Sequence, residues 1–548
     1  MKNSPEEQII FYHEKTKHHF HNYARGPDGL DWPNQPLPFR FYRGSEMLLL
    51  PLLEKDRDAD YEGLYRENNQ CSFTAEHIAG FLELSLSLSA WKEVPGERWS
   101  LRINPSSGNL HPEEAYLILP STGNITCGIY HYNSFLHCLE KRAEVPEELW
   151  QKVKEHFKTE GFLVSLSSIF WREAWKYGER AFRYCNHDTG HALACLRFSA
   201  NIFGWKMKYL NSMSCEDIEK ILGFHKTEWK ELEEEYGEVL CYVYSSYNDI
   251  PGKLPDDIVI SFSDLSFNGI PDELSMEKVK WDIIYETAEA VKKPRTEEYR
   301  YDYGKKELEF LCNSHLKASE IIRCRRSAVD FNRYSSVITK EAFFSILDRT
   351  LQRNNTPPFD IELSMPSVHL FIFVHNVKDL DRGIYFFIRN QKDLEEIKNL
   401  SHPSFLWKEV QRDFPLYLLK KGNFREEAKI ISCIQDIAGD SAFSLGMIAK
   451  FRETVEKEPW KYTHLFWEAG MIGQILYLEA EAKGLRGTGI GCFFDDEVHM
   501  MAGFKDNTYQ SLYHFTIGMP LKDERLIDCP PYYHLKRLYG DEWSTTHR

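Results

Sequence analysis

The sequence lacks features that mark several classes of protein. It contains no apolar run near the ~20 residues that a membrane-spanning helix needs. Its first residues, MKNSPEEQIIFYHEKTKHHFH, include no apolar core of a signal peptide. No block of Lys and Arg stands out, and 83 acidic residues exceed 67 basic ones, which argues against phosphate-backbone binding. We therefore expect neither a membrane span nor a nucleic-acid partner.

Paired cysteines are also missing, since the 12 cysteines include no Cys-x-x-Cys. This argues against a zinc site built on such pairs. In a chain of this size the pattern is more typical of reduced thiols in a cytosol than of a disulfide framework, so we predict a cytoplasmic protein. The early histidines could be read as metal ligands, but an extended arm over the domain surface fits their spacing better: His13, His18, His19 and His21.

The chain is large enough for more than one domain, with 548 residues of which 42% are hydrophobic. Phe73–Lys92 predicts a buried helix with Thr74 as N-cap, and Thr339–Arg353 predicts a helix with Thr339 as N-cap. Three segments rich in β-branched and aromatic residues predict strands: EEAYLIL, Ser367–Asn376 and Gly383–Asn390. The expected fold class is α+β in both halves.

An internal repeat supports a duplicated architecture. Asp188–Gly204 and Glu468–Gly484 both open with acidic-x-Gly, both predict a long apolar helix, and both close on Gly. After the same further interval each half carries Gly-Phe, at Gly223 and Gly503, and then a short strand, VLCYVYS or LYHFTIG. The tripeptide WKY precedes both helices, beginning at Trp175 and Trp460.

These observations divide the chain into two similar units. We predict an extended arm over residues 1–40, a first domain over 41–285, a linker over 286–307 and a second domain over 308–548. Two related units in one chain indicate a covalent pseudo-dimer, which needs no second chain, because a two-fold interface requires two similar surfaces.

Small hydrogen-bonding residues concentrate in LRINPSSGNLHPEEAYLIL (Leu101–Leu119), just before a predicted strand. A turn is the common reading of Pro, Ser, Gly and Asn. The alternative is a loop that grips a planar polar ligand, since Ser and Asn offer donors and acceptors and Gly108 allows close approach.

The second half carries three further candidates. Arg323, Arg325, Arg326 and Ser327 form either a solvated basic turn or an anion site, because guanidinium forks match phosphate. The segment GLRGTGIGCFFDDEV fails the dinucleotide fingerprint, since Cys492 stands where a third Gly is required, and we predict a loop whose backbone approaches a flat ligand. After IGMP, two basic residues predict a second phosphate clamp: Lys522 and Arg525.

Taken together, the RRS cluster, the Pro-Ser-Ser-x-Asn loop, GTGIG and the basic residues after IGMP resemble the FMN-dependent nitroreductase family. WKYGERAFRYCNHDTGHALACL and the N-terminal aromatic arm resemble more narrowly its SagB/ThcOx branch, which includes azoline oxidases. The resemblance covers nearly the whole chain. It implies a nitroreductase-like fold in two fused copies, with FMN at the interface between them.

The motifs are split between the halves in a complementary way. The first half lacks Arg-Arg-Ser and reads FRFYRGSE, and the second half lacks Pro-Ser-Ser-x-Asn and reads NNTPPFDIELSMPSVHL. One complete FMN site and one degenerate site follow from the resemblance. The implied FMN-binding residues are Arg102, Pro105, Ser106, Ser107 and Asn109 from the first half, and Arg325, Arg326, Ser327, Gly489, Gly491, Lys522 and Arg525 from the second.

Two points of chemistry remain open in the sequence. The family motif commonly continues with a cation where this chain has Val329, and Arg102 could supply that charge instead. Lys176 and Tyr177 resemble a Lys-Tyr pair that azoline-oxidising relatives use near the flavin, although both residues could be structural. For His191, on an otherwise apolar helix, a core role is favoured over a catalytic one.

We therefore expect an FMN oxidoreductase that oxidises a small or modified-peptide substrate, or reduces an acceptor with NAD(P)H. The alternative is a weakly catalytic pseudoenzyme that binds a peptide or a protein partner.

Overall fold

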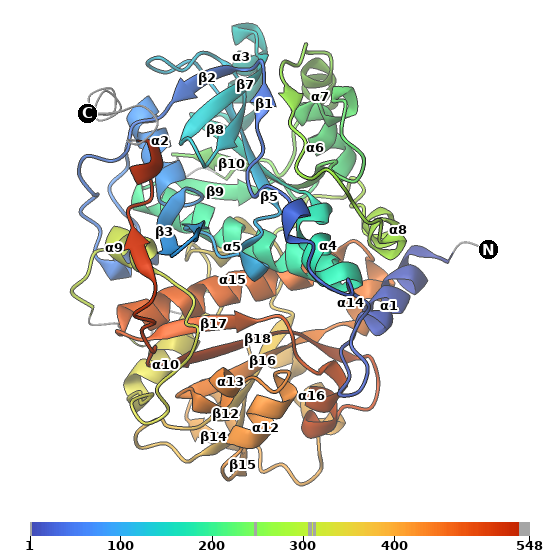
Figure 1. Cartoon of the computed structure of the whole chain (residues 1–548), viewed down its shortest axis with the longest axis vertical. Coiled ribbons are helices and arrows are strands. Elements are labelled where there is room, and N and C mark those ends of the chain that lie inside the picture. The colour runs from blue at the N-terminus through green and yellow to red at the C-terminus, as the bar shows by residue number, and fades with distance from the viewer. Residues whose placement is uncertain (1–2, 246–248, 305–309, 311–313, 536–548) are drawn as a thin grey trace.

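A computed structural model of the chain describes residues 3–245, 249–304, 310 and 314–535. Two seven-stranded antiparallel sheets lie on opposite sides of two long helices, α5 (Ala181–Ile202) and α15 (Lys461–Ala482), as Figure 1 shows. The N-terminal half builds one sheet and the C-terminal half builds the other. The predicted mixture of helices and strands in both halves is confirmed.

The first sheet has the order β2-β7-β6-β5-β8-β10-β9 and the second has the order β14-β15-β13-β12-β16-β18-β17. From β7 and β15 onward, the two orders correspond strand for strand. The strands of the first sheet are β2 (Glu46–Leu49), β5 (Glu113–Leu119), β6 (Gly128–Asn133), β7 (Cys138–Glu144), β8 (Gly161–Ser168), β9 (Lys206–Tyr209) and β10 (Tyr236–Tyr244). Those of the second are β12 (Val368–Val374), β13 (Gly383–Phe387), β14 (Lys408–Gln411), β15 (Phe414–Lys421), β16 (Phe443–Lys450), β17 (Arg486–Ile490) and β18 (Tyr509–Gly518).

The central strands are covered on both faces, which explains their composition. Every residue of β5 and of β12 is buried, and continuous apolar runs are typical of strands without a solvent face. The outer face of the first sheet packs on α3 (Glu147–Phe157), α6 (Cys215–Leu222) and α7 (Asp256–Ser263). The outer face of the second packs on α11 (Leu394–Leu400), α12 (Arg425–Ile431) and α16 (Asp495–Ala502).

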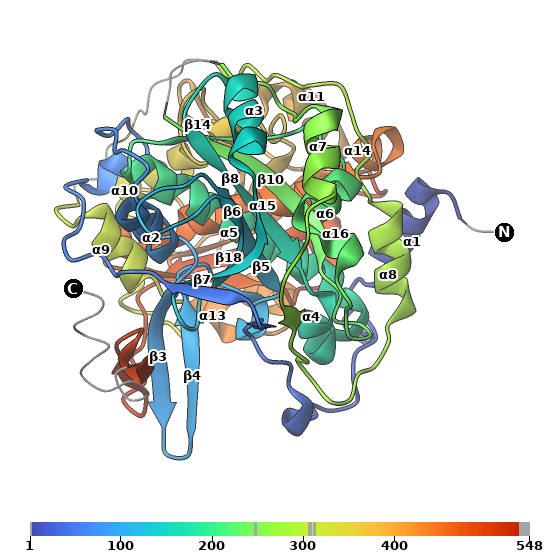
Figure 2. The ribbon, with the colours of Figure 1, turned by 90° about the horizontal axis from the view of Figure 1, so that it is seen from above.

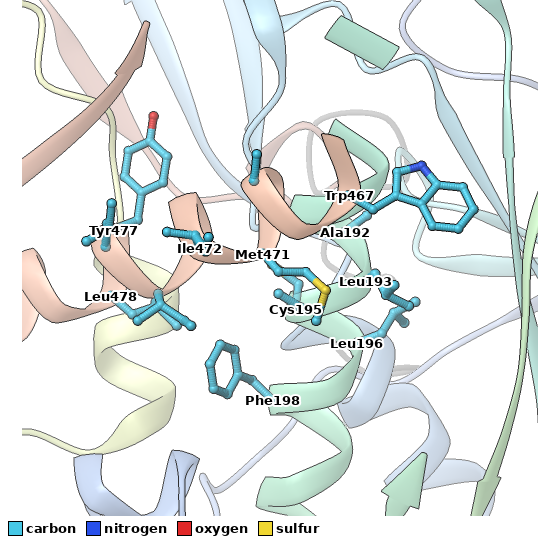
Figure 3. Packing of buried hydrophobic residues seen from close by; sticks show 14 of the residues in the cluster. Ala192, Leu193, Cys195, Leu196, Phe198, Trp467, Met471, Ile472, Tyr477 and Leu478 are labelled. Carbon is cyan, nitrogen blue, oxygen red and sulfur yellow. The ribbon is translucent and has the colours of Figure 1, made fainter. Parts of the chain in front are cut away.

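One apolar core joins the two halves across the central helices. Figure 3 shows side chains of α5, among them Leu196 and Phe198, packed with Met471, Ile472 and Leu478 of α15. The helices cross at two glycines, where a Cβ on Gly190 would lie 2.3 Å from the Trp467 carbonyl oxygen and one on Gly470 would lie 2.2 Å from the His187 carbonyl oxygen. Neither position therefore accepts a larger residue.

The repeated glycines occupy equivalent places in the two halves. Gly204 and Gly484 follow the ends of α5 and α15 with φ of 69° and 68°, and Gly223 and Gly503 end α6 and α16 with φ of 74° and 93°. This left-handed region favours glycine. Together with the crossing glycines, these pairs are separated by one constant interval along the chain, as a duplication requires.

The WKY tripeptides do not share an equivalent place. Lys176 and Tyr177 end α4 (Phe170–Tyr177), whereas Lys461 and Tyr462 begin α15. The spacing of the glycines therefore reveals the repeat, whereas the WKY tripeptide is not part of it. The two tripeptides therefore do not share one structural role, so a shared role does not explain why Lys176 and Tyr177 are present.

Both predicted N-caps are confirmed, but one helix is shorter than predicted. The Thr74 hydroxyl accepts from the backbone N–H of His77, and Thr339 accepts from Ala342. α10 (Lys340–Arg349) follows the second cap. After the first, α2 ends at Glu83 (Ala75–Glu83), and the remainder of the predicted helix enters a strand, β3 (Leu88–Val94). Residues 84–87 form a turn between α2 and β3, and the Leu-Ser alternation of LSLSLSAW across this turn does not have the period of a helix, which the prediction overlooked.

The N-terminal region is partly helical, which corrects the expectation of an extended arm. α1 (Pro5–Lys15) starts at a capping box on Ser4 and packs against α8 (Asp282–Ala290), a helix that crosses the predicted border between the first domain and the linker. Residues 305–307 of the predicted linker, and 308–309, 311–313 and 536–548 of the predicted second domain, lie outside the described residues. The other helices are α9 (Ala318–Cys324), α13 (Asp436–Asp440) and α14 (Arg452–Lys457).

The C-terminal segment returns to the first half. β3 and β4 (Glu97–Arg102) form a projecting hairpin, visible in Figure 2, and β19 (Ile527–Cys529) pairs with β3. A short pair, β1 (Tyr42–Arg43) with β11 (Ile270–Pro271), lies elsewhere in the first half. None of the helices in the described part of the chain has the length and apolar character needed to cross a bilayer.

Candidate functional site

A cavity of about 660 Å³ lies between the halves, bounded by β4, β17, β18 and both central helices. The structure brings nearly all the predicted cofactor residues into its wall. These are Arg102, Pro105, Ser106, Ser107, Asn109, Arg325, Arg326, Ser327, Gly489, Gly491 and Lys522.

Two segments of the second half shape the floor of the cavity. Ser327 forms a parallel bridge with Gly487 of β17, and the Ser327 hydroxyl bonds the Tyr477 hydroxyl at 2.8 Å. Tyr477 also accepts the backbone N–H of Gly489 at 3.0 Å. The Arg-Arg-Ser segment and the Gly-rich segment are therefore one unit, held together through a tyrosine of α15.

The Gly-rich segment is a strand, not the predicted loop. It forms β17, at the edge of the second sheet. A Cβ on Gly489 would lie 1.8 Å from the Tyr513 hydroxyl oxygen, and one on Gly491 would lie 2.4 Å from the Tyr184 ring. These glycines thus make room for two tyrosines that line the cavity, which is a local reason for their presence.

The cavity wall carries an excess of positive charge. Six basic residues line it, Lys92, Arg102, Arg325, Arg326, Arg486 and Lys522, against the acidic Asp188, Asp523 and Asp528. Arg326 donates to the backbone carbonyls of Arg323, Arg325 and Ser89, at 2.8, 2.6 and 3.1 Å. Burial, together with the neighbouring Arg325 and Arg486, lowers the pKa of Arg326 to about 10. An anion in this part of the cavity would reverse that effect.

Arg325 is held in place but not fully satisfied. Its guanidinium donates to the carbonyls of Arg102 and Ile103, both at 3.1 Å, and lies over the Tyr477 ring at 5.0 Å from the centroid. Its Nη1 is buried without a hydrogen-bond partner within the described residues. A buried donor without a partner is costly, so its presence in a cavity wall indicates a site for an acceptor.

The Pro-Ser-Ser-x-Asn loop uses most of its polar groups internally. The backbone N–H of Ser107 donates to the Asp188 carboxylate at 2.9 and 3.1 Å, and the Ser107 hydroxyl donates to it at 3.1 Å. The Asn109 amide donates to the carbonyl of Ser100 and accepts from His111. These residues fix the shape of the loop.

Asn104, which the sequence interpretation did not select, is the unsatisfied member of the same loop. It is 1% exposed, it lines the cavity, and its Oδ1 and Nδ2 have no hydrogen-bond partner in the described part of the chain. One amide offers a donor and an acceptor side by side, which suits the edge of a planar heterocycle. Asn104 could have been found in the sequence by its position directly before Pro105, in the loop for which ligand binding was the alternative reading.

Three buried carboxyl groups lie beneath this loop. Burial and the nearby Asp188 raise the pKa values of Glu113 and Glu173 well above their ordinary range, and burial raises the pKa of Asp188 to about 7. Ser106 donates weakly to Glu173, at 3.5 Å. Protons are therefore held close to the cavity at neutral pH. The sequence interpretation identified Asp188 but neither glutamate.

The Lys-Tyr pair touches the loop from the side of α4. Tyr177 lines the cavity, and a Cβ on Gly108 would meet the Tyr177 hydroxyl at 2.6 Å and Lys176 Nζ at 3.2 Å. Lys176 itself is not part of the wall; its ammonium lies 5.3 Å from the centroid of the Tyr177 ring. Burial and the Glu173 carboxyl raise the pKa of Tyr177.

Four other residues singled out in the sequence have clear places in the structure. Arg525 is outside the cavity wall; its side chain is 86% exposed and pairs with Asp523 at 2.7 Å. Val329 lines the cavity. The Arg102 guanidinium bonds the carbonyls of Pro38 and Glu113, and burial lowers its pKa. His191 also lines the cavity; it bonds Gln474 and Tyr513, and burial lowers its pKa to about 3.

Arg486 is another residue that the sequence interpretation missed. It opens β17 in the segment GLRGTGIG, lines the cavity, and has a 3.4 Å ion pair with Glu481. Its closeness to the RRS segment depends on the bridge between Ser327 and Gly487, which a single sequence does not reveal.

The counterpart of this cavity on the other side of the pseudo-two-fold is filled. Gly487 and Gly489 lie in β17, and Gly491 directly follows it. The residues at the equivalent positions of the first half are Met207, Tyr209 and Asn211, all about 2% exposed. The Asn211 amide donates to the carbonyl of Tyr299 at 2.8 Å, so the linker packs against this face. Tyr301 stacks between Tyr299 and Tyr303, at centroid distances of 6.3 and 6.1 Å.

Comparison with solved structures settles the fold. A candidate nitroreductase from Anabaena variabilis matches 94% of this chain and 99% of its own, with a TM-score of 0.67 and 20% identity. The Escherichia coli microcin synthetase McbBCD complex with truncated pro-MccB17 bound matches 44% of this chain and 81% of that chain, with 17% identity and a TM-score of 0.26. The NADPH:FMN oxidoreductase from Vibrio harveyi complexed with NAD+ matches 37% and 68%, with 15% identity and a TM-score of 0.21.

The first of these structures alone decides the fold, because the TM-scores of the other two are low. The chain has the nitroreductase fold, in two fused copies that form an intramolecular pseudo-dimer. No protein-family model matches the chain, and no curated protein matches it.

Proposed function

We propose that this protein is an FMN-dependent oxidoreductase with one FMN site per chain, in the cavity between its two halves. The main support is the unsatisfied polar surface there: Arg325 Nη1 and both amide atoms of Asn104 are buried without partners in the described residues. They lie among basic residues that outnumber the acidic ones. FMN carries a phosphate and a planar heterocycle, which are the two kinds of group that such a surface fits.

The phosphate of FMN would bind beside the cations of the second half. Arg325, Arg326, Arg486 and Lys522 are the candidates, because a phosphate with up to two negative charges needs several cations to offset its desolvation. Asn104, from the first half, is the candidate for the edge of the isoalloxazine ring. When bound, the flavin supplies the redox chemistry, and the protein supplies binding, orientation and proton handling.

Proton handling falls to groups at the Pro-Ser-Ser loop. Lys176 and Tyr177 are the candidate catalytic pair, with the carboxyl groups of Asp188 and Glu173 within the same cluster. Because burial and Glu173 raise the pKa of Tyr177, its phenol takes a proton from a substrate only as it passes its own proton to another group. This arrangement suits the azoline-oxidase-like reaction of the SagB/ThcOx branch, in which a substrate loses a proton and a hydride. It also accommodates reduction of an acceptor with NAD(P)H as the electron donor.

One observation favours the alternative, a weakly catalytic pseudoenzyme that binds a peptide or a protein partner. The position where related motifs place a cation is Val329, whose side chain is apolar and 79% exposed. The Arg102 guanidinium, which was to replace that charge, is directed to two carbonyls. A peptide-binding protein would keep the cavity and dispense with the flavin.

The presence of flavin distinguishes the two functions. Purified protein that carries FMN, or that binds it with saturation at one equivalent per chain, supports the oxidoreductase. Failure to bind FMN under any condition in which the chain is folded would favour the pseudoenzyme. Turnover of azoline peptides, nitroaromatics and quinones, with and without NADPH, then separates oxidation of a substrate from reduction of an acceptor.

A further inference from the structure

A cysteine of the cavity wall, which the proposed function does not use, lies close to a second cysteine behind the wall. Cys492 follows the end of β17 and lines the cavity, and Cys433 follows α12; both are partly exposed. Their side chains interact with each other electrostatically. Two further bonds brace the segments that carry them: Phe494 N–H donates to the Ile431 carbonyl at 2.8 Å, and Gln435 Nε2 donates to the Cys492 carbonyl at 3.2 Å.

The backbone at Cys433 is held in an unusual conformation. Cys433 and Ile434 have φ of 54° and 59°, two consecutive residues other than glycine in the left-handed region. A β-branched residue such as Ile434 adopts this region rarely. Strain of this kind persists where the surroundings impose it, and it collects at functional sites. Here it places the Cys433 side chain against Cys492.

The two thiols differ in character because of their neighbours. The side-chain hydrogen bond from Cys433, followed by the hydrogen bond from His18 and the charge of Arg180, lowers the pKa of Cys492 to about 5 against the effect of burial. The bond to Cys492, with burial, raises the pKa of Cys433. Besides His18 and Arg180, the titratable groups that face the pair from other segments are Tyr23, Tyr177, Tyr184 and Asp495.

The donor from the N-terminal region is well defined. His18 Nδ1 accepts the backbone N–H of Ala24 at 3.0 Å, so in the neutral ring the proton is on Nε2, the nitrogen left to donate to Cys492. Arg180 is fixed by bonds to the carbonyl of Gly491 and to Asp495, both at 3.1 Å. No group of His, Cys, Asp or Glu suited to a metal ion occurs among the described residues.

We propose that Cys492 and Cys433 form a redox-active thiol pair that exchanges with low-molecular-weight disulfides entering the cavity. The Cys492 thiolate attacks one sulfur of the disulfide R–S–S–R, so that a Cys492–S–R bond forms and R–S⁻ leaves. Cys433 then loses its proton, attacks the sulfur of Cys492 and releases the second R–S⁻, which closes a Cys433–Cys492 disulfide. Two electrons pass from the pair to the substrate, and an excess of a low-molecular-weight thiol reverses the exchange.

The test uses the reduced full-length chain without added flavin, so its result does not depend on FMN binding. The probe is 4,4′-dithiodipyridine at limiting concentration, followed by the release of thiopyridone between pH 6 and pH 8. An ordinary thiol with a pKa near 8.5 slows about a hundredfold over this range as its thiolate is lost. We expect a fast phase that slows by less than about twofold, two equivalents released, and peptide mapping that joins Cys433 to Cys492.

Matched variants assign the two roles. Cys433→Ser should keep the fast phase but release one equivalent and retain a mixed disulfide on Cys492, and Cys492→Ser should abolish the fast phase. Cys324→Ser removes an exposed thiol elsewhere and should change neither. The proposal is overturned if peptide mapping of the oxidised wild-type chain finds no Cys433–Cys492 disulfide, a result that requires no variant to fold, or if the fast phase loses most of its rate at pH 6.

Discussion

Removal of the Arg326 guanidinium tests the proposed phosphate site directly. Arg326→Met keeps most of the aliphatic stem and deletes the charge. In the wild-type protein this charge is close to Arg325 and Arg486, and the cluster lowers the pKa of Arg326 to about 10. The hydrogen bonds of its guanidinium go to carbonyl oxygens of Arg323, Arg325 and Ser89, and the nearby Asp528 carboxylate offsets only part of the repulsion from the two arginines.

The expected effect on FMN follows from the strength of one charge-assisted hydrogen bond. Such a bond to phosphate contributes about 1.5–3 kcal/mol, which corresponds to roughly a tenfold to hundredfold increase in Kd. The free protein should change much less in stability. It loses hydrogen bonds to three carbonyls, and at the same time it loses the repulsion from Arg325 and Arg486.

The assay is a titration of the flavin-free protein with FMN, followed by calorimetry or by flavin fluorescence. Arg525→Met is the matched control, because Arg525 is exposed, pairs with Asp523 and lies outside the cavity wall. Inorganic phosphate should raise the unfolding temperature of the wild-type protein and of the control more than that of Arg326→Met, since a ligand stabilises the state that binds it. Equal FMN affinity in wild type and Arg326→Met would refute the phosphate role, and so would equal weakening by the control.

Three further outcomes are expected. Flavin released from the saturated protein should amount to one FMN per chain, because the linker fills the second site; two per chain would contradict this. Tyr177→Phe and Lys176→Ala should leave FMN bound and lower turnover by about a hundredfold, the usual size of an acid–base contribution, and unchanged kcat would remove both residues from the chemistry. Asp188, whose pKa is about 7 in the folded state and ~3.9 unfolded, contributes stability that is present below pH ~4 and is lost as the pH rises through 7. Urea unfolding should therefore give a free energy of unfolding about 2.5 kcal/mol lower at pH 8 than at pH 5, a difference that Asp188→Asn removes, and an equal difference in the variant would exclude Asp188 as its source.

The sequence was most informative where local geometry fixes a residue type. Glycine is needed at a left-handed helix end, and it recurs at the same interval in both halves, so Gly223 and Gly503 predicted the duplication without any structure. The caps at Thr74 and Thr339 are equally local, because each hydroxyl bonds an N–H in the next turn. Such signals depend on a few neighbouring residues, and they were confirmed.

The sequence was least informative about which polar group bonds which partner. Ser107 and Asn109 have the chemistry of ligand-binding residues, yet Asp188 and Ser100 use their donors. Asn104 has the same chemistry and no partner in the described part of the chain, because folding leaves it facing the cavity. In the sequence, a polar residue that bonds within the protein has the same composition and spacing around it as one that faces the cavity. The difference arises from contacts between segments far apart in the chain.

The filled second site has a physical explanation in the cost of the first one. A cavity lined with buried cations and unsatisfied donors destabilises the protein until a ligand occupies it. In a homodimer both sites carry this cost, since one sequence builds both. In a fused chain the halves diverge independently, and Tyr209 stands where the other half keeps Gly489. The proposed site therefore keeps its ligand-ready surface, while at the equivalent place in the other half Tyr209 is buried in the core.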